Sequence, residues 1–114
     1  MSYKNTIEVI QNDYGYNLEG QITDDAGNIV DLTGCTLKLI IYEPGVTPAK
    51  IEKTATVKLP ATNGEWIYLV TLGDFNVGDK WYNVEVEVTR ASPAQTVTAI
   101  GAKIYVRQEA PEVS

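Results

Sequence analysis

Four oxygen-bearing side chains lie close together in the sequence, at Asp24, Asp25, Asn28 and Asp31. Carboxylate and amide oxygens in a loop with a glycine can bind calcium, which takes about six to eight oxygen ligands. This stretch lacks the spacing and the terminal glutamate of an EF-hand loop. The same residue types also form hairpin turns, because Asp and Asn accept hydrogen bonds from the nearby backbone. We predict a structural turn that binds no metal.

The residues needed for common enzyme chemistry are missing from this chain. It contains no histidine, which excludes Ser-His and Cys-His nucleophile pairs and His-containing zinc sites. The single cysteine, Cys35, shares the alternation of the apolar residues after it and is expected to be a small buried side chain. A carboxylate pair can cleave a glycosidic bond, but Glu85 and Glu87 alternate with valines, on the expected solvent side of a strand. We predict a protein that is not an enzyme and has no cofactor.

The charge and hydropathy of the chain limit its partners. The net charge of the 114 residues is −6, whereas nucleic-acid binding requires a basic surface. The same charge disfavours adsorption to anionic membranes. No apolar run approaches the roughly 18 residues of a membrane span, and no signal peptide is evident. We therefore expect synthesis in a reducing cytosol, no nucleic-acid partner and no membrane insertion.

Apolar and polar residues alternate over short stretches separated by turn-forming residues. Alternation with a period of two, bounded by Gly, Pro, Asn and Asp, is typical of β-strands. Turn signals at a spacing of roughly 8–12 residues indicate a β-sandwich or a barrel. We predict one all-β domain over residues 1–107 and a mobile C-terminal tail at residues 108–114. The predicted strands are residues 6–11, 16–23, 35–43, 51–59, 65–72, 80–90 and 95–107, the last being one strand or a pair.

The segment at residues 24–34 is expected to be a turn followed by a corner. Gly27 can adopt a positive φ in the turn without steric cost. In the corner, Leu32 is the one large apolar side chain among polar turn-formers, so it is expected to fill the core while Gly34 lets the backbone change direction. We assign a structural role to Asp24, Gly27, Asn28, Asp31, Leu32 and Gly34.

This segment also carries a family resemblance. A strand, an Asp-x-x-Gly-Asn turn, a Val-Asp-Leu-Thr-Gly corner and an apolar strand together resemble the N-terminal domain of phage upper baseplate proteins and related phage tail modules. The resemblance covers residues 11–43 and continues more loosely through residues 64–68 and 78–85. It implies a two-sheet antiparallel immunoglobulin-like sandwich of seven or eight strands, which we favour over a closed barrel.

The resemblance also implies a role. It indicates a non-enzymatic virion structural protein, made in the host cytoplasm, that acts in a tail or baseplate through contacts with other virion proteins or with copies of itself. In upper baseplate proteins such a domain anchors the chain to the tail hub, and further segments, absent from this chain, carry receptor-binding proteins. A capsid-decorating β-sandwich protein is one alternative. Another is a carbohydrate- or receptor-binding module with a stacking platform formed by Tyr14, Tyr16, Trp66 and Trp81.

Two predicted strands carry apolar residues on both faces. If Trp66 and Tyr82 face the core, as we predict, then their sequence neighbours Ile67 and Trp81 face away from it. An antiparallel sheet with a solvated outer face alternates more cleanly than this. Either loops and terminal arms cover the outward side chains, or another protein contacts them. We predict that the following residues belong to a protein-contact patch: Ile40, Tyr42, Ile67, Leu69 and Trp81.

Overall fold

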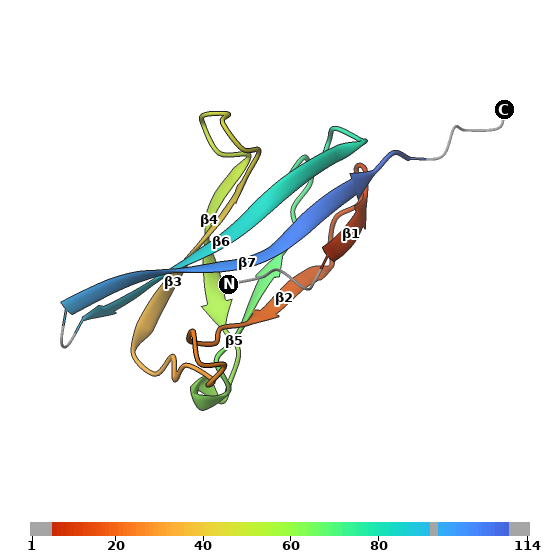
Figure 1. The fold of residues 1–114 in the computed structure, drawn as a ribbon. Coiled ribbons are helices and arrows are strands. Elements are labelled where there is room, and N and C mark those ends of the chain that lie inside the picture. Colours follow the sequence, from red (N-terminus) through yellow and green to blue (C-terminus); the bar gives the residue numbers. More distant parts are fainter. Residues whose placement is uncertain (1–5, 92–93, 110–114) are drawn as a thin grey trace, which may run out of the picture.

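The computed structural model describes residues 6–91 and 94–109. These residues form seven β-strands and one short 3-10 helix (Figure 1). The all-β class is confirmed, and among the described residues no helix is long and apolar enough to cross a membrane. In chain order the elements are β1 (Thr6–Ile10), β2 (Asn17–Gln21), β3 (Cys35–Tyr42), β4 (Ile51–Val57), η1 (Ala61–Asn63), β5 (Glu65–Leu69), β6 (Lys80–Ala91) and β7 (Ala94–Arg107).

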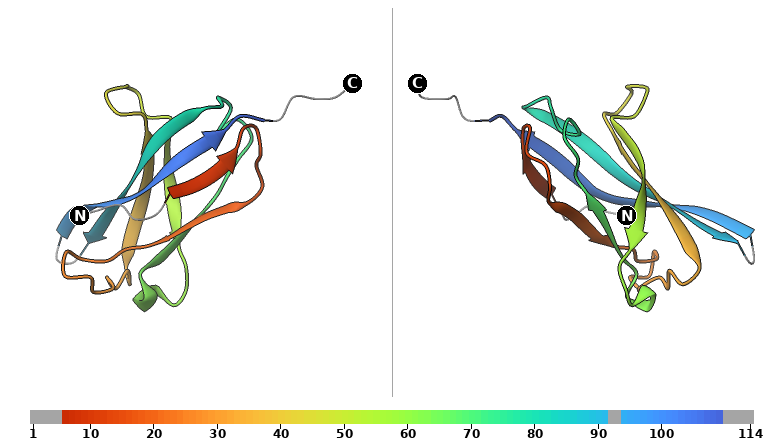
Figure 2. Two further views of the ribbon diagram at one scale, coloured as in Figure 1. Left: turned by 45° about the vertical axis from the view of Figure 1, so that its right-hand side comes forward. Right: turned by 180° about the vertical axis from the view of Figure 1, so that it is seen from behind.

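The seven strands follow one another in a single curled sheet, in the order β1-β7-β6-β3-β4-β5-β2. The sheet is mixed, because β1 runs parallel to β7 while all other paired neighbours are antiparallel (Figure 2). The predicted separation into two antiparallel sheets is not confirmed. Strand β4 pairs with β3 from Ile51 to Ala55 and then with β5 at Thr56 and Val57, so it connects the two halves of the sheet.

The core lies on the inner face of this curl, and every strand contributes buried apolar side chains to it. Trp66 and Tyr82 are both buried, which confirms their predicted place in the core. Trp66 of β5 lies opposite Gly20 of β2. A Cβ at Gly20 would stand 2.6 Å from the Trp66 indole, so the close approach of this ring to the backbone of β2 requires a glycine.

Strand β7 changes its partners along its length. Residues 103–106 lie between β1 and β6, and Arg107 pairs with β1. Between the Asn83–Lys103 pair and the Glu85–Ile100 pair, β6 advances by two residues and β7 by three, which is a β-bulge. Beyond the bulge, residues 94–100 pair with β6 on one side, and no other strand of the described chain pairs with their other side. We call this unpaired side the free edge of β7; it runs to the tip of the β6–β7 hairpin (Figure 1).

The two described residues of the predicted tail follow β7 directly. The backbone N–H of Glu109 donates to Gln11 Oε1 at 3.1 Å, and Asn12 Nδ2 donates to Glu109 Oε2 at 3.1 Å. These bonds connect the chain after β7 to the turn after β1. The rest of the predicted tail, residues 110–114, lies outside the described residues, and the division of the chain at residue 107 stays a prediction.

Candidate functional site

The turn after β2 is organised by one carboxylate. Asp24 Oδ1 accepts the backbone N–H groups of Ala26 at 3.0 Å and Asn28 at 2.9 Å. The N–H of Gly27 donates to the carbonyl oxygen of Asp24 at 2.9 Å, with a Gly27 φ of 86°. These backbone N–H groups of the turn therefore find their hydrogen-bond acceptors within the turn itself. Among the described residues there is no group of three or more His, Cys, Asp and Glu side chains that could hold a metal ion.

The corner that follows contains a second turn in which an aspartate carboxylate accepts hydrogen bonds from a residue after it. Asp31 Oδ1 accepts the hydroxyl of Thr33 at 2.6 Å and its backbone N–H at 2.9 Å, and these bonds lower the pKa of the Asp31 carboxyl. Leu32 is buried, and its N–H donates to the carbonyl oxygen of Ala61 at 3.0 Å. Gly34 has a φ of 74°, a conformation that favours glycine. Leu32 thereby enters the core just before β3 begins.

The predicted contact patch lies on the outer face of the sheet but is not continuous. A continuous patch would require β3 and β5 to pair with each other, whereas β4 lies between them. Ile40 of β3 has Glu85 of β6 on one side and Glu52 of β4 on the other. On β5, Ile67 has Thr56 as one of its two neighbours. Polar side chains therefore separate the two halves of the predicted patch.

The outward residues of the patch also differ in exposure and contacts. Leu69 and Trp81 are exposed, whereas the others are half-buried. The Trp81 ring packs against Tyr105 of β7 with ring centroids 4.9 Å apart. The hydroxyl of Tyr42 donates to Glu85 Oε1 at 2.8 Å, so its polar end is held within the sheet. The role of these residues in binding another protein stays a prediction.

The proposed aromatic platform is divided between two faces of the sheet. Trp66 is in the core, while Trp81 is on the outer face of β6. Tyr14 is exposed in the segment between β1 and β2, and Tyr16 is half-buried, with burial raising the pKa of its phenol. Because the two tryptophans point to opposite faces, they cannot stack on one sugar. This arrangement disfavours a carbohydrate-binding module.

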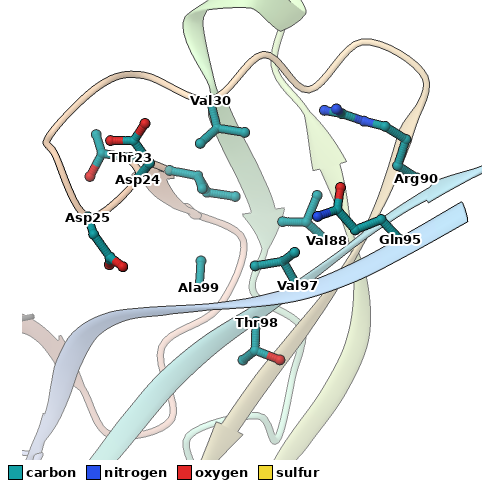
Figure 3. Close-up of a pocket in the computed structure, with 11 residues that line it drawn as sticks. Thr23, Asp24, Asp25, Val30, Val88, Arg90, Gln95, Val97, Thr98 and Ala99 are labelled. Carbon is teal, nitrogen blue, oxygen red and sulfur yellow. The ribbon is translucent and has the colours of Figure 1, made fainter. Parts of the chain in front are cut away.

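A hollow of about 480 Å³ lies at one end of the inner face, between the turn after β2 and the β6–β7 hairpin (Figure 3). The floor of the hollow is largely apolar. Acidic side chains lie on the side of the turn, and Arg90 lies on the side of the hairpin. Arg90 Nη2 donates to the carbonyl oxygen of Asp31 at 2.8 Å and lies 3.6 Å from Sγ of the half-buried Cys35. The lining residues are Ile22, Thr23, Asp24, Asp25, Val30, Val88, Arg90, Gln95, Val97, Thr98 and Ala99.

Val97 in this hollow is an inner-face residue that nothing in the described chain fully covers. It pairs with Val88 across the β6–β7 hairpin, and directly paired residues point to the same face. Val88 is 8% exposed, but Val97 is 51% exposed. This position was not among the residues predicted from the sequence to form a site. A signal was present, because residues 91–102 are the longest stretch of the sequence without a charged residue.

No protein-family model matches this chain, and a search of curated proteins finds no match.

Proposed function

We propose that this chain is a non-enzymatic structural module of a phage virion, acting in a tail or baseplate through protein–protein contacts. One observation carries the proposal: the resemblance over residues 11–43 to the N-terminal domain of phage upper baseplate proteins. In this segment the Asp24 turn and the buried Leu32 lead directly into β3. The polar side chains of this segment accept hydrogen bonds from its own backbone, which supports a structural role for the segment.

The finer fold assignment belongs to the same proposal. We regard the curled sheet as a variant of the two-sheet antiparallel immunoglobulin-like sandwich, with β4 passing from one layer to the other. Two observations support this: strands of both halves contribute to one core, and the β4–β5 ladder contains only the Thr56–Ile67 and Val57–Trp66 pairs. Strand β1 departs from the antiparallel pattern through its parallel pairing with β7.

Immunogold labelling tests the proposed location. Antibodies against the purified protein are applied to phage particles from a culture in which the protein is produced, and the particles are viewed by electron microscopy. We expect label on the tail or baseplate. Label over the capsid would support the capsid-decorating alternative instead. Particles that carry no label anywhere, while the protein is detected free in the same lysate, would overturn a virion role.

The outward residues of β5 can be tested in the same system. Ile67→Thr combined with Leu69→Gln removes two apolar side chains from the outer face. The double variant should be incorporated into particles at least about tenfold less, because burial of these two side chains at a contact would contribute several kcal/mol. Leu59→Gln is a matched control, because Leu59 is exposed but lies outside the predicted patch. Equal incorporation of both variants, each normally folded, would show that β5 is not a contact surface.

A further inference from the structure

The free edge of β7 lacks the devices that normally keep sheet edges apart. An edge strand presents unpaired backbone N–H and C=O groups, and proteins protect such edges with charges, prolines or a covering segment. Residues 94–100 contain no charge and no proline, and within the described part of the chain β6 is their one strand partner. A covering segment is therefore the protection that this edge still allows.

Strand β1 already pairs with β7 on the same side as the free edge. This ladder is parallel, and it begins with Thr6 opposite Lys103. Going back along the chain from Thr6 therefore leads along β7 from Lys103 toward Ile100 and the free edge. Residues 1–5 precede Thr6 in the sequence and lie outside the described residues.

We infer that the segment before β1, residues 2–5, occupies the free edge by continuing the parallel β1 ladder along β7 as far as Thr98. The segment is favoured because it is covalently joined to a strand that is already in place, which keeps its local concentration at the edge high. A second copy of the chain is disfavoured at this edge, because each copy carries a net charge of −6.

Alternation decides which residues of the segment face inward. Val9 of β1 and its partner Val106 of β7 are both buried, so the odd-numbered residues of β1 point to the inner face of the sheet. Continued back along the same strand, this alternation turns Tyr3 inward and Lys4 outward.

The bulge of β7 sets the register of the segment. Ala99 points to the inner face, because it pairs with the buried Val86. The bulge gives β7 one extra residue between Lys103 and Ile100, so two residues of β7 lie opposite one residue of the segment. Tyr3 is then opposite Ala99, and both side chains point to the same face.

The hollow beside Ala99 suits a tyrosine side chain. Its largely apolar floor can take the ring, and Figure 3 shows Asp25 and Ala99 on the side of the hollow away from Arg90. The Asp25 carboxylate has no hydrogen-bond partner within the described part of the chain. The proposed Tyr3 hydroxyl donates to this carboxylate. Three other tyrosine hydroxyls of this chain donate to carboxylates in the same way, in the pairs Tyr42–Glu85, Tyr68–Asp74 and Tyr105–Asp79.

Hydrogen exchange of the purified protein at low concentration tests the inference. The edge-facing amides among residues 98–102 should be protected in the wild type. Deletion of residues 2–4 should lower this protection at least about tenfold, because the covering strand is lost. Deletion of residues 112–114 is the control and should leave the protection unchanged.

A variant of equal length and composition tests the inward place of Tyr3. Ser2→Tyr combined with Tyr3→Ser exchanges two neighbours, so the tyrosine would point to the outer face. This exchange should also lower the protection of residues 98–102. Ser2→Ala alone should not, because it changes an outward residue and keeps Tyr3.

A disulfide cross-link tests the register and does not require the truncated chain to fold. In a Cys35→Ser background, Tyr3→Cys with Ala99→Cys should form an intramolecular disulfide under mild oxidation, because opposite residues on one face have Cβ atoms within reach. Ser2→Cys with Ala99→Cys should not, because these side chains point to opposite faces. Mass spectrometry of the monomer distinguishes the two variants.

Three outcomes overturn the inference. Unprotected amides in the purified wild type would show that the edge is open to another protein. Protection that rises with protein concentration would make a second copy the occupant. Equal cross-linking of the Ser2→Cys and Tyr3→Cys variants would show that the segment has no fixed register. The inference does not depend on the virion role, because these measurements use the purified protein and location is measured on particles.

Discussion

Trp66 and Val97 occupy equivalent positions in the alternation of their strands but differ in their surroundings. Both point to the inner face of the sheet, yet Trp66 is 6% exposed and Val97 is 51% exposed. Trp66 is covered because β2 pairs with β5 and offers Gly20 opposite the indole. Val97 lies near the end of the β6–β7 hairpin, where the turn after β2 lines the hollow without closing over it. Alternation therefore decides the face of a side chain, and segments distant in sequence decide whether that face is covered.

Removal of the Trp66 side chain should give the largest effect. Trp66→Ala leaves a cavity that Gly20 cannot fill, so the free energy of unfolding should fall by about 3–5 kcal/mol. This is a large share of the roughly 5–15 kcal/mol that stabilises a typical domain. Urea denaturation followed by circular dichroism measures the change. A loss below about 1 kcal/mol would mean that the β2–β5 side of the inner face is not closely packed.

Tyr68 tests the same covered side through pH. Burial, and then the hydrogen bond from its hydroxyl to Asp74 Oδ2 at 2.7 Å, raise the pKa of Tyr68 to about 12 from 10.0. The folded state thus favours the protonated phenol, and this contribution is complete below pH 10 and is lost as the pH rises from 10 toward 12. A two-unit shift corresponds to at most about 3 kcal/mol.

The measurement compares the wild type with Tyr68→Phe. The unfolding free energy of the wild type should decline more steeply between pH 10 and pH 12 than that of the variant, and the late-ionising part of the tyrosinate absorbance of the folded protein should be smaller by one group in the variant. Parallel pH profiles for the two proteins would show that the Tyr68 hydroxyl is solvated in the folded state.

The smallest effect is expected at Val97. Val97→Thr keeps the shape of the side chain and adds a hydroxyl, which costs stability only where it is buried. The unfolding free energy should change by less than about 0.5 kcal/mol. Val88→Thr is the paired control and should cost about 1–3 kcal/mol, because Val88 is buried. Equal losses in thermal denaturation would contradict the contrast between the covered and uncovered parts of the inner face.

The features that sequence reasoning identified are local ones. Trp66, Tyr82 and Leu32 are buried as predicted, because alternation and turn chemistry depend on neighbouring residues. The predicted patch joined Ile40 to Ile67 because both lie on the outward parity of apolar strands. Which strands become neighbours depends on contacts between residues far apart in the sequence, and in this fold β4 lies between β3 and β5. The uncovered Val97 was missed for the same reason, since its exposure depends on where the turn after β2 ends relative to β7.

The parallel pair of β1 and β7 has a consequence for how the chain folds. Thr6 lies opposite Lys103, so the first strand finds its one strand partner in the described chain at the far end of the sequence. Contacts of such large separation carry the highest loop-closure entropy and form slowly. On the ribosome, β2 through β6 can assemble as they emerge, but β1 must wait until β7 has been synthesised. Residues 6–10 are therefore exposed to chaperones and proteases for longer than any other strand.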